Sequence, residues 1–244
     1  MYQNQKILCF IGARGGSQGL RNKNILDFGG KPMVAWTIGA GRGSKYVDRT
    51  IVSTNNAEIA EISRACGAEV PFMRPEHLAT HDASLADGIY HCIDWLKSNQ
   101  NAAFDYVVAL LPTSPLRTAQ HLDDAIEQYF LKRKTCYDTL GSVSVISNKI
   151  GKLMFKRKNG YFDFCFEVSK TNPMRQGLPE YYLPNGAIFL APILPDRSQP
   201  LFNGDKMLAY QMPTEISVDI DTVEDLDLAL TVFHKRGLGV TTQL

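Results

Sequence analysis

The sequence has almost no net charge, since its 26 basic and 25 acidic residues leave a formal charge of +1. Such a chain has no broad field to hold nucleic acid or an anionic membrane surface. No apolar stretch approaches the length of a membrane-spanning helix, and the amino terminus runs almost directly into an apolar, strand-like segment. We therefore expect no nucleic-acid partner, no membrane association and a cytoplasmic location, and any affinity for phosphate must come from a local arrangement.

Cysteine and histidine patterns typical of redox or metal sites are also missing. The five cysteines include no CxxC pair, and their odd number leaves at least one unpaired, which favours reduced, partly buried thiols. The five histidines show no metal-ligand spacing, and we assign none of them to catalysis.

What the sequence does have is a regular alternation of short β-branched runs with segments of helical period. Hydrophobic residues make up 44% of the 244 residues, enough for one principal core. The pattern indicates βαβ units, and we expect a three-layer α/β fold with a mainly parallel, twisted sheet flanked by helices. The predicted strands are Lys6–Ile11, Thr50–Ser53, Glu69–Met73, Tyr106–Leu111, Leu140–Val145 and Ala187–Leu190, with an extended Ile216–Ile220. The predicted helices are Pro32–Ala40, Ala57–Cys66, Ser84–Lys97, Gln120–Lys132 and one from Thr222, its expected N-cap, to about Lys235.

This rhythm breaks between residues 147 and 184, where lysine, asparagine, proline and aromatic residues mix with alternating segments such as Tyr161–Val168. We interpret this region as an inserted hairpin lobe. The predicted organisation is therefore a nucleotide-binding α/β region over residues 1–146, the lobe over 147–184, and completion of the α/β domain over 185–244.

The segment from Gly12 to Asn24 follows the first predicted strand and is rich in glycine. Its four glycines allow backbone N–H groups to approach a phosphate without obstruction by side chains, and Arg14 and Lys23 add two cations. A triphosphate suits such a loop. We also expect Asn24, which carries both a donor and an acceptor, to fix the ribose or the base, although it could be a simple turn residue.

Two other phosphate motifs are excluded. A Walker loop needs a glycine-lysine pair followed by serine or threonine, but Gly30-Lys31 leads to Pro32. A dinucleotide fold needs a glycine loop that opens directly into a helix and an acidic residue at the end of the next strand. Here the loop continues to Asn24, and the second strand is followed by Thr54 and asparagines.

Asp219 and Asp221 are spaced by two at the end of an extended run, so both side chains point to the same side of the backbone. Paired carboxylates make a hard oxygen site suited to Mg²⁺, which takes one or two carboxylates plus substrate phosphates. The alternative is that one of the aspartates only caps the helix after Thr222.

Five motifs, in order, resemble those of the acylneuraminate cytidylyltransferases, which activate sialic acids and related nonulosonic acids as CMP sugars. ARGGSQGLRNKN, from Ala13, is similar to the family's ARGGSKGxxxKN. The others are Phe72-Met73-Arg74-Pro75 with Leu78-Ala79, Leu111-Pro112-Thr113-Ser114-Pro115-Leu116-Arg117, Asn185-Gly186-Ala187-Ile188-Phe189 and Asp219-Ile220-Asp221. The chain departs from the pattern at Gly12, where proline is common, at Gln18, where the family has lysine, and at Leu111, where glutamine is usual.

The resemblance implies the Rossmann-like fold of nucleotide-diphospho-sugar transferases and a Mg²⁺-dependent transfer of CMP from CTP to an acidic 2-keto sugar. Arg74 would contact cytosine, and Arg175 would pair with the sugar carboxylate. The nucleotide-binding residues would be Ala13, Arg14, Gly15, Gly16, Ser17, Lys23, Asn24, Arg74, Ala83 and Ser84, and the sugar-binding residues Leu111, Thr113, Ser114, Arg175, Gln176, Asn185 and Phe189. Arg14, Lys23, Arg175 and Asp221 would be catalytic, Asp219 and Asp221 would hold Mg²⁺, and the enzyme would be a homodimer.

Several alternatives stay open at this point. Ser84 could equally be a surface residue of its helix. Sialic, legionaminic and related nonulosonic acids all remain candidate acceptors, as does another sugar such as 3-deoxy-manno-octulosonate. A nucleotide-binding homologue without chemistry is a further possibility, against which the aspartate pair argues.

Overall fold

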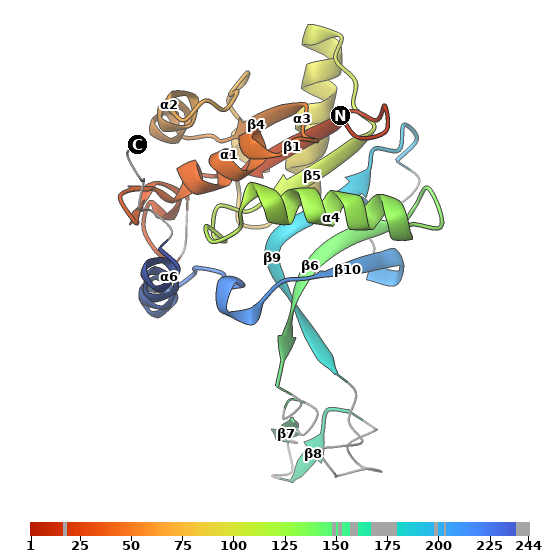
Figure 1. Ribbon diagram of the computed structural model, residues 1–244. Coiled ribbons are helices and arrows are strands. Elements are labelled where there is room, and N and C mark those ends of the chain that lie inside the picture. Colours follow the sequence, from red (N-terminus) through yellow and green to blue (C-terminus); the bar gives the residue numbers. More distant parts are fainter. Residues whose placement is uncertain are drawn as a thin grey trace.

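In the computed structural model, the described residues are 1–16, 19–147, 150, 153–156, 161–166, 180–197, 200–202 and 204–237. A six-stranded sheet forms the centre of the fold, in the order β10-β6-β9-β5-β1-β4 (Figure 1). Its strands are β1 (Ile7–Gly12), β4 (Arg49–Ser53), β5 (Tyr106–Leu110), β6 (Thr139–Ile146), β9 (Tyr181–Pro192) and β10 (Met207–Gln211).

The three strands β4, β1 and β5 run parallel, with Ile11 opposite both Val52 and Leu110. Their carboxyl ends therefore meet at one edge of the sheet, which is where open α/β sheets bind ligands. On the other side of β5, β9 runs antiparallel to β5 and to β6, and β10 is parallel to β6. The expected mainly parallel sheet is confirmed, with β9 as the strand that reverses direction.

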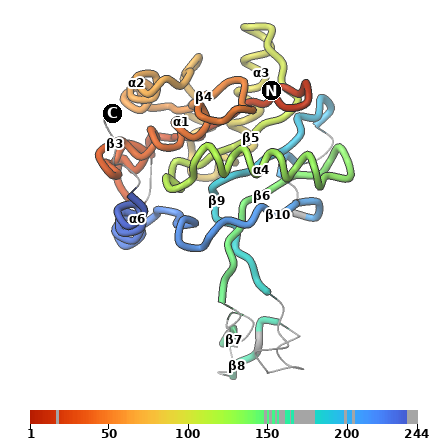
Figure 2. Tube along the Cα trace, viewed as in Figure 1, coloured from red at the N-terminus to blue at the C-terminus, as the bar shows by residue number. Residues whose placement is uncertain are grey.

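The alternation of side chains along β1 separates two cores. Ile7, Cys9 and Ile11 face one side of the sheet, and Leu8 and Phe10 the other. The larger core lies under four helices: α1 (Met33–Gly43), α2 (Ala57–Ala65), α4 (Ala119–Lys132) and α6 (Val223–Lys235) (Figure 2). The smaller core lies under α3 (Leu85–Gln100). Both faces of β1 are covered, which explains its uninterrupted apolar sequence.

Each of three helices begins with a capping box, in which a hydroxyl side chain and the residue three positions later bond each other's backbone N–H groups. The pairs are Ser84 with Asp87 in α3, Thr118 with His121 in α4, and Thr222 with Asp225 in α6. The expected N-cap at Thr222 is therefore confirmed. None of the helices in the described part of the chain is long and apolar enough to cross a membrane.

Beyond the body of the protein, β6 and β9 continue side by side as a two-stranded arm, with Ile146 opposite Tyr181 (Figure 1). A small hairpin of β7 (Met154–Lys156) and β8 (Phe162–Phe164) lies at its tip. The hairpin at the tip lies within residues 147–184, the predicted lobe. The arm itself also includes the end of β6, before that range, and residues 181–184 are part of β9.

Two predicted strands are wrong. Only Glu69 of Glu69–Met73 forms a bridge, to Ile51. Ile216–Ile220 does not pair as a strand; it follows the 3-10 turn η6 (Thr214–Ile216), and the Ile220 N–H donates to the Thr113 carbonyl at 2.9 Å. This segment contacts the turn after β5. Ile216 and Ile220 are buried in the core, but they do not form one face of a strand. The short elements not expected from the sequence are η1 (Lys23–Ile25), β2 (Asp27–Phe28), β3 (Lys31–Pro32), η2 (Glu76–Leu78), η5 (Gly204–Lys206) and β10.

Arg117 is the largest fully buried side chain and fixes the turn after β5. Its Nε donates to the Ala187 carbonyl at 2.9 Å, and its Nη2 donates to the Thr37 hydroxyl at 3.0 Å and to the Leu111 carbonyl at 3.1 Å. Its Nη1 has no hydrogen-bond partner among the described residues. Burial lowers the pKa of Arg117 to about 10. The guanidinium thus joins β9, α1 and the end of β5.

Replacing Arg117 by methionine should destabilise the protein strongly, because it leaves buried carbonyl groups without donors. We expect Arg117→Met to lower the free energy of unfolding by about 2–4 kcal/mol, measured by urea denaturation. The control is Arg236→Met, since Arg236 forms an exposed ion pair with Glu215 at 2.6 Å and should cost less than about 0.5 kcal/mol. Equal losses for the two variants would contradict this role.

Candidate functional site

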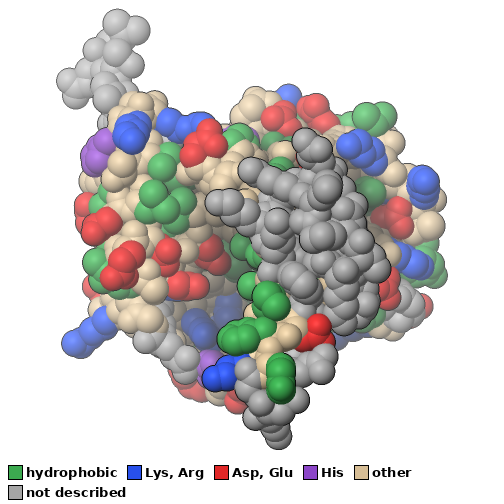
Figure 3. Space-filling model, turned by 90° about the horizontal axis from the view of Figure 1, so that it is seen from below, with side chains coloured by type: hydrophobic (Ala, Val, Ile, Leu, Met, Phe, Trp, Pro, Cys, Tyr) green, Lys and Arg blue, Asp and Glu red, His purple; other side chains and the backbone are tan. Residues whose placement is uncertain are grey.

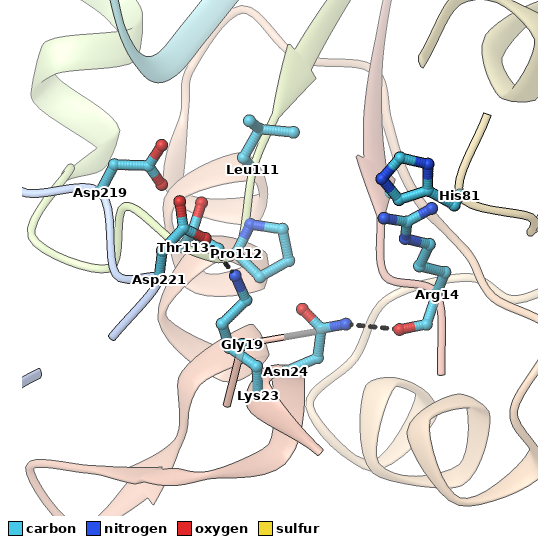
Figure 4. A pocket seen from close by; sticks show the side chains of 11 residues that line it. Arg14, Gly19, Lys23, Asn24, His81, Leu111, Pro112, Thr113, Asp219 and Asp221 are labelled. Carbon is cyan, nitrogen blue, oxygen red and sulfur yellow. Dashed lines mark hydrogen bonds and ion pairs between the residues drawn. The ribbon is translucent and has the colours of Figure 1, made fainter. Parts of the chain in front are cut away.

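A cavity of about 390 Å³ opens at the carboxyl ends of β1 and β5 (Figure 4). Four separate segments of the chain form its walls. The lining residues are Gly12, Arg14, Gly19, Lys23, Asn24, His81, Leu111, Pro112, Thr113, Asp219 and Asp221. The sequence predicted seven of these as ligands of nucleotide, sugar or metal: Arg14, Lys23, Asn24, Leu111, Thr113, Asp219 and Asp221.

The first half of the glycine segment is anchored to the end of β4. The Ala13 N–H donates to the Ser53 carbonyl at 3.0 Å, and the Gly15 N–H donates to Asn55 Oδ1 at 2.9 Å. A Cβ atom at Gly15 would lie 2.9 Å from the Cβ atom of Asn56, so this approach requires glycine. Gly16, the next residue, has open space around it. These contacts hold the loop against the sheet edge.

Two hydrogen bonds set the position of Arg14. The buried Asn24 donates from Nδ2 to the Arg14 carbonyl at 2.9 Å, which ties the two ends of the loop together. The Arg14 guanidinium donates to the Thr80 carbonyl at 2.6 Å, across the cavity from the aspartates (Figure 4). The Asn24 amide therefore organises the loop and also faces the cavity.

The opposite wall is acidic, as the spacing of the two aspartates predicted. The Lys23 ammonium lies 2.5 Å from Asp221 Oδ1, and its side chain is 13% exposed against 67% for Asp221. Desolvation raises the pKa of Asp219, the Thr113 hydroxyl opposes this by hydrogen bonding, and the charge of Asp221 raises it further. The Asp221 carboxylate is thus paired with an ammonium, whereas burial raises the pKa of Asp219 and so disfavours its charged form.

The alternative that Asp221 only caps α6 is wrong, because Thr222 and Asp225 make that cap. Asp219 and Asp221 instead present oxygen atoms to the cavity, which fits a hard cation such as Mg²⁺. The described residues contain no group of three or more histidine, cysteine or acidic side chains that could hold a metal. A cation at this place would therefore take its remaining oxygen ligands from substrate and water.

A glycine in β9 brings the acidic wall and the end of β5 together. Gly186 has φ +70°, and a Cβ atom there would lie 3.3 Å from Leu111 Cδ1 and 3.6 Å from Asp219 Oδ2. The left-handed backbone and the close approach both favour glycine. Leu111 and Thr113, two residues predicted to contact the sugar, line the cavity at this point.

Ser114 and Asn185, also predicted as sugar contacts, are buried and are not among the described residues that line the cavity. Asn185 accepts from Ser142 at 2.5 Å and donates to Ser217 at 2.8 Å, and its carbonyl accepts from Ser114 at 3.3 Å. A buried amide needs such partners. These contacts satisfy the Asn185 side chain and support the cavity wall from behind.

Phe189 and Ser84 also lie outside the described lining of the cavity. The Phe189 ring packs on Phe202 with centroids 5.4 Å apart, in the core under α3. The Ser84 hydroxyl is engaged in its capping box with Asp87, which favours the structural alternative for this serine. The neighbouring Ala83 is half-buried. Three further predicted residues, Ser17, Arg175 and Gln176, lie outside the described residues.

Arg74 lies immediately behind the cavity. Its Nε donates to the Ser53 hydroxyl at 2.9 Å and its Nη2 to the Ser53 carbonyl at 2.8 Å. A Cβ atom at Gly12, which lines the cavity, would lie 3.3 Å from Arg74 Nη2. Burial, and then the charge of Arg14, lower the pKa of Arg74 to about 10. Arg74 therefore lies beside Gly12, at the carboxyl end of β1.

Sequence reasoning missed His81, which lines the cavity next to Arg14 (Figure 4). Its Nδ1 lies 3.0 Å from Asp82 Oδ1. No local motif marks this histidine; its position follows from the Thr80 carbonyl that holds Arg14. The place of His81 in the loop after Arg74-Pro75 was the available signal.

Comparisons with known proteins show the family of this chain. The family model described as cytidylyltransferase matches residues 8–163. The N-acylneuraminate cytidylyltransferase of Escherichia coli is 36% identical over 95% of this chain, which spans 53% of that protein. The pseudaminic acid cytidylyltransferase of Campylobacter jejuni is 28% identical over 93% of this chain and 96% of its own length. The chain thus spans about half of one relative and nearly all of the other.

A solved structure of CMP:2-keto-3-deoxy-manno-octonic acid synthetase complexed with CTP superimposes with a TM-score of 0.68. The match covers 95% of this chain and 99% of that chain at 15% identity. At this identity the likeness supports the fold.

The raised pKa of Asp219 predicts a pH-dependent cost in the ligand-free protein. A carboxyl whose pKa is higher in the folded state binds protons more readily there, so folding loses stability as the pH rises through that pKa. We expect Asp219→Asn to raise the melting temperature at pH 7 by about 1–2 °C, and this gain should vanish as the pH falls toward 4. The control Glu61→Gln, on the exposed side of α2, should show no such gain. A gain that grows as the pH falls would contradict the prediction.

Proposed function

This chain belongs to the cytidylyltransferase family, and we propose that it transfers CMP from CTP to the anomeric hydroxyl of an acidic 2-keto sugar. Pyrophosphate leaves when the hydroxyl oxygen bonds to the α-phosphorus. The observation that supports this most directly is that one cavity holds two cations and two carboxylates, with Arg14 across from the aspartates and Lys23 paired with Asp221. Nucleotidyl transfer needs cations around the leaving phosphates and an oxygen site for a divalent ion.

The nucleotide would lie along the glycine segment. Arg14, fixed by Thr80, and Lys23 would bind the phosphates, and Gly15 and Gly16 would let them approach the backbone. Arg74, beside Gly12, and Asn24 would contact the base and the ribose. Ala83 would line the base pocket, whereas the Ser84 hydroxyl would first have to leave its cap.

The metal ion belongs to this proposal as well. Asp219 and Asp221 would hold Mg²⁺, which when bound neutralises charge on the phosphates and lowers the pKa of a hydroxyl that approaches it. The Thr113 hydroxyl donates a hydrogen bond to Asp219 and would keep that carboxylate oriented toward the cavity. Among the described residues that line the cavity, the candidates for a general base are these two carboxylates and His81.

For the acceptor we propose a sialic, legionaminic or related nonulosonic acid. Leu111 gives the sugar side of the cavity an apolar wall, and Thr113 gives it a hydroxyl. Arg175 and Gln176 stay our proposed ligands of the sugar carboxylate. The solved relative with a bound CTP is named for 2-keto-3-deoxy-manno-octonic acid, so that sugar is the second candidate.

We also propose a homodimer in the cytoplasm. Exposed apolar side chains concentrate on the arm, and Figure 3 shows some of them at its surface. They are Leu153, Met154, Tyr161, Phe162, Tyr182 and Leu183. Several exposed apolar side chains in one region favour contact with another protein, and a second copy of this chain is the partner that we propose.

The proposed reaction can be tested with purified protein, CTP, Mg²⁺ and a panel of nonulosonic acids and 3-deoxy-manno-octulosonate. We expect pyrophosphate release with at least one nonulosonic acid, and none when UTP or ATP replaces CTP. CTP binding without pyrophosphate release for any acceptor would support the non-catalytic alternative instead.

Asp221→Asn should separate chemistry from nucleotide binding. Because its carboxylate would hold the metal, we expect kcat to fall by about 100-fold or more, with a change in the Kd of CTP of less than about 5-fold. Calorimetry gives the Kd and pyrophosphate release gives kcat. The matched control is Asp94→Asn, since Asp94 forms a surface ion pair with Arg197. Loss of CTP binding in proportion to kcat would argue against a metal role for Asp221.

A further inference from the structure

The ion pair between Lys23 and Asp221 joins two groups that the proposed function assigns to different ligands. Lys23 would bind the polyphosphate, and Asp221 would bind the divalent cation. In the ligand-free protein their atoms lie 2.5 Å apart and neutralise each other (Figure 4). Each ligand would therefore compete with one member of this pair for the other.

Backbone packing keeps the two groups together. A Cβ atom at Gly19 would lie only 2.4 Å from the backbone oxygen of Asp221, so the glycine segment rests directly on the segment that carries the aspartates. The Lys23 side chain is 13% exposed, which leaves its ammonium little contact with bulk water. The pair is therefore a built feature of the cavity and differs from a surface pair between two mobile side chains.

We infer that Lys23 couples the binding of the two ligands by pairing with Asp221 when both are absent. A cation at Asp219 and Asp221 releases the ammonium, which is then free for the polyphosphate. A polyphosphate that draws Lys23 away leaves Asp221 unpaired beside Asp219, and this raises the affinity of the two carboxylates for a cation. The coupling is reciprocal, as linkage requires, and it rests on the proposed nucleotide function.

Removal of Lys23 should strengthen the binding of a cation and weaken the binding of a polyphosphate. Without Lys23, a cation competes with no ammonium for Asp221, and the repulsion between two neighbouring carboxylates favours its binding. The polyphosphate, in contrast, loses a charged donor. A lysine that served only to bind phosphate, without a partner in the free protein, would leave the affinity for a cation alone nearly unchanged.

The first experiment measures Mn²⁺ binding to the nucleotide-free protein by electron paramagnetic resonance of the free ion. We expect Lys23→Met to bind Mn²⁺ about 2- to 5-fold more tightly than the wild type, and to bind CTP about 10-fold more weakly. The matched control is Lys45→Met, which removes the lysine of the Lys45–Glu127 pair, 3.4 Å apart and remote from the cavity. Unchanged or weaker Mn²⁺ binding in Lys23→Met would overturn the inference.

A second experiment needs no variant that might fold poorly. Mass spectrometry follows the rate at which acetic anhydride acetylates Lys23 in the wild-type protein. Saturating Mg²⁺ alone should increase this rate at least about 2-fold, because the ammonium loses its carboxylate partner, and adding CTP should then decrease it. A rate unaffected by Mg²⁺ would overturn the inference. Neither readout requires turnover. The coupling can therefore fail while CMP transfer is observed, and the coupling can be observed while CMP transfer fails.

Discussion

The parallel register of β4, β1 and β5 is the constraint on which the site depends. It brings Gly12, Ser53 and the residues after Leu110 to one edge of the sheet. Other segments around the cavity are attached to that edge: the glycine segment through Asn55, the aspartate segment through Thr113, and Arg74, behind the cavity, through Ser53. Because the hydrogen bonds of the sheet hold these three strand ends together, the side chains that follow them need little further ordering to converge.

Positive charge without a carboxylate partner surrounds this edge. Arg74 and Arg117 are both largely or fully buried and hydrogen-bond mostly to carbonyl and hydroxyl oxygens among the described residues. Burial lowers the pKa of each, because these oxygens carry no full negative charge to offset the loss of water. The dipoles of these carbonyl and hydroxyl groups orient the two guanidinium groups but carry no net charge that would neutralise them. A polyanion in the cavity would supply the missing negative charge, whereas Lys23 is already neutralised by Asp221.

Local patterns in the sequence predicted the features that local physics determines. The buried strands, the amphipathic helices and the cap at Thr222 were predicted because each has a periodicity or end signal of its own. The structure also brings Arg14, Lys23, Asp219 and Asp221 into one cavity. Strand β10 was missed because it is a partly exposed edge strand with no clear alternation. The position of His81 and the network around Asn185 depend on contacts between residues distant in the sequence, such as Arg14 with Thr80 and Ser142 with Asn185, and no spacing rule could have indicated them.

Strand β9 is part of both the arm and the central sheet. Its first residues, from Tyr181, pair along the arm, and a few positions later Gly186 lies against Leu111 and Asp219. Since β6 and β9 leave the sheet as neighbours, everything beyond them is joined to the body at two adjacent points. Loop closure across such a junction depends only weakly on the length of the inserted chain. The tip can therefore vary in size and composition without altering how the sheet closes, while Gly186 at the base holds Leu111 and Asp219 together in the cavity wall.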